Sequence, residues 1–339
     1  MKNHQWLRWV LFFTIINFTL LGLVNYIVDP FRVFGSNFLP YQVQMNERFV
    51  KIEYIKKNHH KFNAYLFGSS RIGTTEPSMI EKYVPNSKFY NFTLSSGNLH
   101  DYQLNLEFFI KEKYPLKTLY LQLDLDDMSI YGQQESDYLC KLHPEVTNEF
   151  TSVYYMKYLF GFFPMNTRVK IMDNIDNQKS KRRHIEKGTW SLKAKEERLV
   201  KSCEEYVKHV SSFNTKHRRT RKYTTAELSM KSLKRIVDLC HTNNIKLYLF
   251  TSPHNQNKMD TFLLEDYKKY LRDISEIISF YDFTGYNSVT KDNCNYYEMS
   301  HYRPQVAKLI AARIFNDTSI SVPSDFGKYI EKGSMRGNE

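Results

Sequence analysis

Short apolar runs alternate with longer stretches of helical spacing along most of the chain. The short runs cover residues 64–68, 88–93, 118–124, 245–251 and 279–283. Between them, segments such as 101–113 and 225–241 repeat their apolar residues at helical intervals. Strands that alternate with helices predict an α/β domain, with a parallel sheet that helices cover on both faces.

The amino-terminal stretch 9–28 contains no charged residue. About 20 such residues span a bilayer, and Lys2 and Arg8 precede them, which places the amino terminus in the cytoplasm. A signal peptide and a buried core helix are the alternatives. The stretch is long for a signal peptide. It has no polar face, which argues against a core helix. We therefore expect an uncleaved, single-pass anchor with the rest of the chain outside the cytoplasm. Asn17 and Asn25 are polar enough to contact another membrane helix.

The pattern divides the chain into three parts. Residues 1–35 are expected to form a cytoplasmic start, the transmembrane anchor and a juxtamembrane turn. Residues 36–316 form the α/β domain, with an insertion at about 129–223 that carries an aromatic cluster at 154–163. Residues 317–339 are polar, and we expect a loosely held tail.

Composition and charge limit the class of protein and the kinds of partner that the chain can have. Of the 339 residues, 15% are aromatic and only 12 are glycine, a composition that excludes a disordered or repeat protein. The net charge is +12. Much of the positive charge lies in two runs, 179–184 and 216–222. Such runs can bind nucleic acid. Outside the cytoplasm, an anionic lipid or a polyanionic glycan is a better partner for them. The alternative for either run by itself is a solvated loop without a partner.

Four cysteines are widely spaced: Cys140, Cys203, Cys240 and Cys294. An oxidising compartment would allow disulfides, and buried thiols explain the residues equally well. Their spacing matches no metal motif. Neither a metal nor another cofactor is expected.

The candidate chemistry begins where the first strand ends, at Gly68-Ser69-Ser70-Arg71. Ligands of open α/β sheets bind at the carboxyl ends of the strands. Far downstream, Glu298 and His301 lie three residues apart and could orient one another. Serine early, with acid and histidine late, is an accepted order for a hydrolase triad. The plainer interpretation is a turn or cap serine.

These motifs resemble the SGNH (GDSL-type) hydrolases, over roughly residues 65–315. Gly68-Ser69-Ser70 stands where that family has Gly-Asp-Ser, and the loop 296–303 stands where it has Asp-x-x-His. The resemblance is closest to the membrane-anchored envelope branch, which serves teichoic acid D-alanylation and alginate O-acetylation. It implies a flavodoxin-like three-layer α/β/α sandwich, with Ser70 as nucleophile and the Gly97 amide in the oxyanion hole.

The chain departs from that family at two positions. Glu298 replaces the usual aspartate, and Asp124 stands at the strand end where the family has an oxyanion-hole asparagine. A carboxylate donates to an oxyanion only when protonated. The hole would then use the amides of Ser70 and Gly97, or borrow Asn98.

Other residues near the expected site are weaker candidates. Arg71 follows the nucleophile directly, and His254 follows the fourth strand; a surface loop would also explain the histidine. Asp124, Asp126 and Asp127 could hold a metal, although acidic strand ends more often cap or face solvent.

The sequence therefore predicts extracytoplasmic, serine-dependent acyl transfer or ester hydrolysis on a cell-envelope glycan or polymer. The resemblance adds a membrane-bound O-acyltransferase as a partner. The alternative is a catalytically impaired SGNH-like accessory protein that binds a surface polysaccharide or such an acyltransferase. Nucleic-acid binding would require the basic runs to be cytoplasmic.

Overall fold

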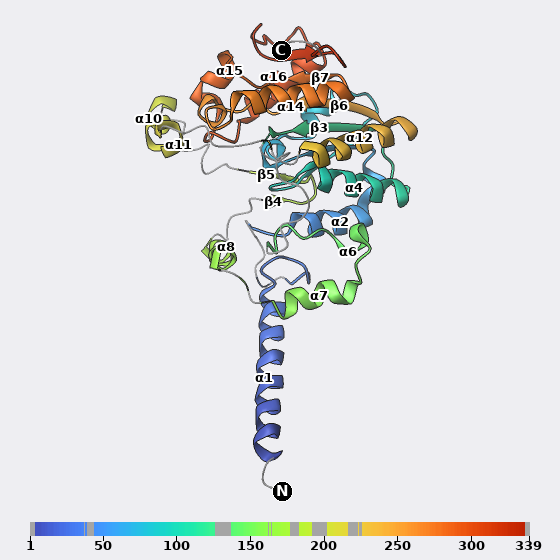
Figure 1. Ribbon diagram of the computed structural model, residues 1–339, viewed down its shortest axis with the longest axis vertical. Coiled ribbons are helices and arrows are strands. Elements are labelled where there is room, and N and C mark those ends of the chain that lie inside the picture. The colour runs from blue at the N-terminus through green and yellow to red at the C-terminus, as the bar shows by residue number, and fades with distance from the viewer. Residues whose placement is uncertain are drawn as a thin grey trace. The chain divides into compact units, whose positions relative to one another are not determined.

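The computed structural model (Figure 1) describes residues 4–36, 38, 44–125, 137–161, 163, 165–176, 183–191, 202–215, 223 and 226–335. Asp126, Asp127, residues 179–182 of the first basic run and the whole second run lie outside this part of the chain. The chain divides into two compact units. The first comprises residues 1–54 and 133–183, and the second comprises residues 55–132 and 184–339.

The first unit begins with helix α1, Gln5–Val28, which has 24 residues. It is long and apolar enough to cross a membrane, and nearly all of its side chains are exposed. The prediction of such an amino-terminal helix is confirmed. After it, the buried Asp29 carboxylate accepts hydrogen bonds from the amides of Val33, Phe34 and Ser36, which closes a tight turn.

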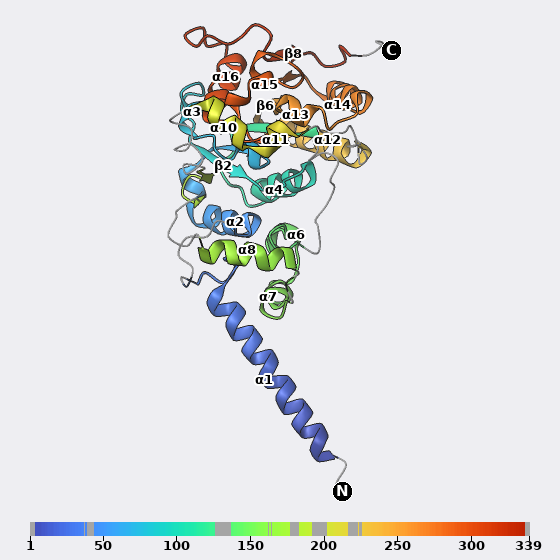
Figure 2. The same ribbon diagram turned by 90° about the vertical axis from the view of Figure 1, so that its left-hand side faces the viewer.

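Two rings of the aromatic cluster, Tyr154 and Tyr158, lie in the core of this first unit. Helices α6 (Pro144–Thr147), α7 (Thr151–Leu159) and α8 (Met165–Asp176) belong to it, and α2 (Glu47–Asn58) begins in it (Figure 2). Tyr154 and Tyr158 of α7 are fully buried against Phe31 and Phe49. These rings are core residues and not an exposed platform for sugars.

The second unit is built on a six-stranded sheet, in the order β2-β1-β3-β6-β7-β8. The first five of these strands run parallel, and β8 is antiparallel to β7. The five parallel strands fall in the five predicted apolar runs. Their bounds are β1 Ala64–Gly68, β2 Phe89–Thr93, β3 Thr118–Leu123, β6 Lys246–Thr251 and β7 Phe280–Asp282.

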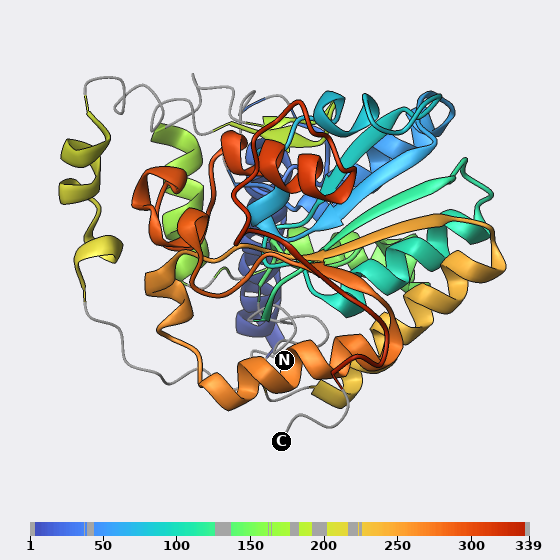
Figure 3. The same ribbon diagram turned by 90° about the horizontal axis from the view of Figure 1, so that it is seen from above.

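Helices cover both faces of this sheet, as Figure 3 shows from above. Tyr65 and Phe67 point to one face, where they pack on Phe109 of α4 (Leu99–Lys111). Ala64 and Leu66 point to the other face, in the core formed with α3 (Ser78–Glu81) and α16 (Pro304–Ile314). Successive strand residues alternate in direction, so a strand covered on both faces needs a continuous apolar run.

All remaining described elements belong to the second unit, except β4, whose first residue, Arg183, ends the first unit. On the α4 face, α12 (Ala226–Thr242) packs against α4 and against α14 (Leu264–Ile277). The short elements are η2 His59–Lys61, η3 Ser70–Ile72, β4 Arg183–His184, β5 Thr189–Trp190, α10 Cys203–His209, α11 Ser211–Asn214, α13 Gln256–Met259, α15 Ser288–Lys291 and η4 Asn293–Asn295.

The carboxyl-terminal segment corrects the prediction of a loosely held tail. Strand β8, Lys328–Ile330, pairs with β7, and Phe326 before it is fully buried in the core against Phe283. An edge strand of three residues with two exposed side chains leaves almost no apolar signal in the sequence.

Candidate active site

Ser70 begins the short helix η3, directly beyond the carboxyl end of β1. The turn requires glycine at position 68, because a Cβ there would come within 2.9 Å of Gln122 and of Ile72. Ser69 caps η3 by accepting a hydrogen bond from the Arg71 amide. The chain therefore turns sharply at the strand end and holds Ser70 at the sheet edge, as the sequence predicted.

The structure brings Ser70, His301 and Glu298 together. Ser70 Oγ lies 2.8 Å from His301 Nε2. On the other side of the ring, His301 Nδ1 is hydrogen-bonded to Glu298 Oε1. When Nδ1–H donates its hydrogen bond to the Glu298 carboxylate, Nε2 carries a lone pair. That lone pair accepts the hydrogen bond from the Ser70 hydroxyl. This is the arrangement of a nucleophile, a general base and an orienting acid.

Glu298 is held in place by the backbone of its own loop. The amides of Ser300 and His301 donate to its two carboxylate oxygens, over 3.0 and 2.9 Å. Burial alone would raise the pKa of Glu298. The hydrogen bonds and positive charge of His301, together with the two amides, outweigh burial and lower the pKa to about 2. The carboxylate therefore stays ionised at neutral pH, where it stabilises a protonated His301.

Asp124 lies in a buried polar network beside the turn 68–71, which carries Ser70. Its Oδ2 accepts a hydrogen bond from Ser69 Oγ over 2.6 Å and pairs with Arg71 Nη1 over 3.2 Å. Gln122 Nε2 donates to the same oxygen over 3.2 Å, and His254 Nε2 lies 3.7 Å from Oδ1. These contacts give Asp124 a role in holding the turn, which differs from the expected place in an oxyanion hole.

Arg71 and His254 lie in this network, away from solvent. Arg71 is only 5% exposed, and its Nε donates to the carbonyl oxygen of Ser300 over 3.1 Å. His254 is 1% exposed and packs against Phe262, so it does not lie on a surface loop. Both residues contact Asp124, which holds the turn 68–71.

The predicted oxyanion donors behave differently from one another. The Gly97 amide donates to the carbonyl oxygen of Leu94 over 2.9 Å, inside its own turn. The Asn98 side chain accepts from the amides of His100 and Asp101 and caps α4. Of the residues that the structure describes, none accepts a hydrogen bond from the Ser70 amide. Of the two predicted backbone donors, Gly97 N–H is engaged, and Ser70 N–H has no acceptor among the described residues.

Trp190 of β5 is a site residue that the sequence did not predict. Its indole meets the His301 ring edge to face, with ring centroids 5.6 Å apart. The Trp190 amide donates to the Gly73 carbonyl oxygen over 3.0 Å. A Cβ at Gly73 would lie 1.5 Å from the indole nitrogen, so the tryptophan fits only against a glycine. A single tryptophan inside an insertion carries no positional signal.

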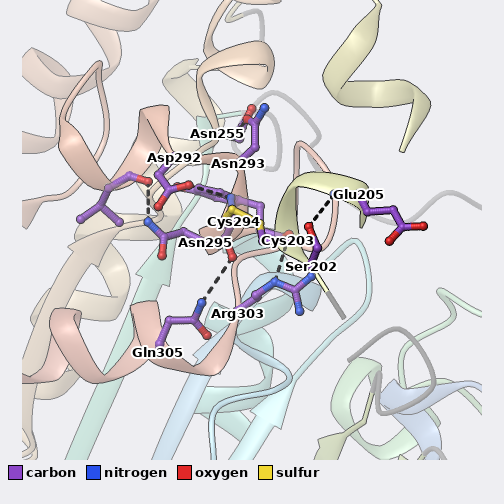
Figure 4. Close-up of a disulfide and its surroundings, with 12 residues drawn as sticks. Ser202, Cys203, Glu205, Asn255, Asp292, Asn293, Cys294, Asn295, Arg303 and Gln305 are labelled. Carbon is purple, nitrogen blue, oxygen red and sulfur yellow. Dashed lines mark hydrogen bonds between the residues drawn. A yellow bond between two sulfur atoms is a disulfide. The ribbon is translucent and has the colours of Figure 1, made fainter. Parts of the chain in front are cut away.

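A disulfide joins Cys203 of α10 to Cys294 of η4, four residues before Glu298 (Figure 4). Beside it, the Arg303 guanidinium lies over the rings of Tyr206 and Tyr297. Tyr206 also donates from its hydroxyl to the Tyr297 carbonyl oxygen over 2.6 Å. The segment 202–215 is thus fastened to the loop that supplies the base. Cys140 and Cys240 are buried free thiols. Of the two interpretations of the cysteines, disulfides and buried thiols, each therefore applies to one pair of residues.

One group in the described part of the chain has the spacing of a metal site: Glu53, His143 and Glu145, in the first unit. His143 Nδ1 accepts a hydrogen bond from the Glu145 amide, and Nε2 faces Glu53 over 3.1 Å. A neutral imidazole that accepts at Nδ1 carries its proton at Nε2. In that tautomer the ring has no lone pair left for a metal, and the group is a hydrogen-bonded trio.

No protein-family model matches the sequence, and no curated protein matches it. The geometry at Ser70 is therefore what any assignment of function depends on.

Proposed function

We propose that this protein is a serine-dependent acyltransferase or esterase, and that Ser70, His301 and Glu298 form its catalytic triad. The observation that carries the proposal is the 2.8 Å contact between Ser70 Oγ and His301 Nε2, with Glu298 bonded to the far side of the ring. A buried core histidine would explain the His301 contacts less well, because its side chain is 26% exposed beside the nucleophile.

The first chemical step would form an acyl-enzyme. Ser70 Oγ attacks the carbonyl carbon of an acyl ester while its proton passes to His301 Nε2. The ionised Glu298 stabilises the imidazolium that forms. The Ser70 amide is placed to donate to the developing oxyanion. As the tetrahedral intermediate collapses, the leaving alkoxide takes the proton from His301.

The second step would reverse these roles. A water molecule or an acceptor hydroxyl gives its proton to His301 Nε2 and attacks the acyl carbon. Collapse of the new intermediate returns that proton to Ser70 Oγ. Water as the acceptor makes the protein an esterase, and a glycan hydroxyl makes it an acyltransferase.

The sheet order supports the resemblance to SGNH hydrolases. Numbered along the chain, the parallel strands run 2-1-3-4-5, the flavodoxin-like order, in which ligands bind near the first and third strands. The serine follows the first of these strands, and the histidine immediately precedes α16. Asp124 in place of the asparagine remains the main departure from that family.

The compartment is part of the proposal. An apolar first helix of membrane-spanning length and a disulfide beside the site fit a domain outside the cytoplasm. There the acyl acceptor would be a cell-envelope glycan or polymer. By resemblance, a membrane-bound O-acyltransferase would supply the acyl group.

A fluorophosphonate probe tests the activity, because it modifies only serines that a base activates. We expect covalent labelling that maps to Ser70 by peptide mass and is absent in Ser70→Ala. Ser69→Ala is the matched control, since Ser69 is the neighbouring hydroxyl but donates to Asp124. Labelling of Ser69, or no labelling of a folded protein, would contradict the proposal.

A non-catalytic accessory protein is the second candidate. The engaged Gly97 amide and the Asp124–Arg71 ion pair favour it, since both leave the oxyanion hole with fewer donors. An accessory protein would bind a surface polysaccharide or a membrane acyltransferase and would not react with the probe.

A further inference from the structure

Helix α7 has an apolar face that no described residue covers. Val153 and Met156 of α7, three residues apart, are 45% and 55% exposed, and Phe150, which directly precedes the helix, is 81% exposed. Residues three apart share one side of a helix. On the opposite side, Tyr154 and Tyr158 are buried in the core. A surface helix of a soluble protein normally turns polar residues outward, so this bare face needs an explanation.

The carboxyl end of α7 meets α1 within the apolar part of that helix. The Phe160 ring lies against Phe18, with centroids 6.0 Å apart, and a Cβ at Gly22 would come 3.1 Å from it. Asn25 Nδ2 donates to the Leu159 carbonyl oxygen over 2.7 Å. Asn25 therefore finds its partner inside this chain. Its hydrogen bond satisfies a helix-end carbonyl that would be costly to leave open in lipid.

The bare face of α7 and the exposed surface of α1 are continuous. Phe160 follows Met156 by four residues and Val153 by seven, so all three share one side of α7. In Figures 1 and 2, α7 lies beside the carboxyl-terminal end of α1. Between the two helices is an open groove of about 520 Å³, lined by apolar side chains such as Ile15, Phe18 and Leu23.

The position of this contact along α1 sets its depth in a membrane. At 1.5 Å per residue, Gly22 and Phe18 lie about 9 and 15 Å along the helix from Val28. If α1 crosses a bilayer, its hydrocarbon core of about 30 Å takes up the apolar stretch. Trp9 near one end and Tyr26 near the other are exposed aromatic residues of the kind that mark the two interfaces. Phe160 then lies below the membrane surface.

We infer that α7 is a second membrane-contacting element, which lies in the bilayer interface at the Val28 end of α1. Phe150, Val153 and Met156 insert among lipid acyl chains, and an acyl chain fills the groove beside α1. Lys157 lies on the same side of α7, four residues after Val153, and pairs with Glu149. Its long apolar stem lets the ammonium group reach the headgroups. The inference rests on the membrane anchor of the proposed function and is independent of the triad.

Depth-dependent fluorescence quenching tests this inference. An environment-sensitive fluorophore is attached to Met156→Cys in full-length protein in phosphatidylcholine vesicles, after Cys140 and Cys240 are replaced by alanine. We expect emission to be lost when the vesicles contain lipids with a nitroxide on the acyl chain. Aqueous iodide should leave the emission nearly unchanged. The same label at Val24→Cys of α1, which is 56% exposed, reports whether the anchor is inserted.

The two labels separate the outcomes. Lipid quenching at both positions supports the inference. Lipid quenching at position 24 with iodide quenching at position 156 overturns it and leaves the anchor intact. If neither quencher reaches position 156, another protein covers α7, and the inference is wrong. If the label at position 24 is not lipid-quenched, the anchor fails and the inference fails with it, whatever the fluorophosphonate probe finds at Ser70.

Discussion

Arg71 Nε donates a hydrogen bond over 3.1 Å to the carbonyl oxygen of Ser300, and so joins the end of β1 to the loop that carries His301. The same guanidinium pairs with Asp124 through Nη1, and both side chains are buried. Arg71, next to Ser70, therefore holds together the turn after β1, the end of β3 and the loop that carries His301. The distance from Ser70 to His301 depends on that junction.

Arg71→Met should lower the free energy of unfolding by about 3–5 kcal/mol, because Asp124 is left as a buried charge with its cation removed. Adding Asp124→Asn should recover part of the loss. Urea denaturation measures both effects. Lys268→Met removes a cation from an exposed pair with Glu265 and should cost less than about 1 kcal/mol. An Arg71 variant as stable as that control would contradict the account.

Gly73→Ala should displace Trp190 from His301. The backbone at Gly73 is ordinary helical, with φ −63°, so an alanine strains nothing there except the contact with the indole. We expect a loss of about 1–3 kcal/mol from overpacking, measured by urea denaturation. Trp190→Ala in the Gly73→Ala background should relieve the steric part. If Gly73→Ala alone is neutral, Trp190 does not lie as described.

Acid should destabilise the protein through Glu298. In the unfolded chain its pKa is near the ordinary 4.5, and in the folded protein it is about 2. As pH falls between these values the unfolded state takes up the proton first, so the stabilisation present above pH 4.5 is lost progressively down to about pH 2. The loss should total about 3 kcal/mol. Between pH 5 and pH 3, the free energy of unfolding measured by urea denaturation should fall less steeply for Glu298→Gln than for the wild type. An equal fall in both proteins would contradict this.

Breaking the disulfide should loosen the base loop. Cys203 and Cys294 are 91 residues apart in sequence, and a cross-link over such a loop stabilises by about 4.6 kcal/mol in the chain-entropy model. The Cys203→Ser/Cys294→Ser variant should have a lower Tm and slower fluorophosphonate labelling. A reductant should lower the Tm of the wild type and leave the variant unchanged. Equal effects of the reductant on both proteins would point to another cause.

The parallel sheet could be predicted from the sequence because each of its strands is an apolar run with helices before and after it. Leu66 and Phe67 face opposite sides of the sheet and are both buried, so the run is continuous and easily seen. Strand β8 could not be predicted in this way. It is a short edge strand, and its place is set by pairing with β7.

The triad could be proposed from sequence because strand-end position and residue type together mark Ser70, and Glu298 and His301 share one loop. Its supporting contacts could not. Arg71 and Asp124 are far apart in sequence, and nothing local indicates that one neutralises the other. Trp190 reaches His301 only because Gly73 makes room for it. Such contacts depend on tertiary packing.

If Ser70 and His301 act as one catalytic unit, the hydrolysis of para-nitrophenyl acetate by four proteins will show it. These are the wild type, Ser70→Ala, His301→Ala and the double variant, each checked for folding by circular dichroism. Removing His301 should lower the rate by about 100-fold to 10,000-fold. The double variant should be no slower than Ser70→Ala alone, because members of one unit are not additive. Full activity in Ser70→Ala, or a double variant whose loss is the product of the two single losses, would contradict the account.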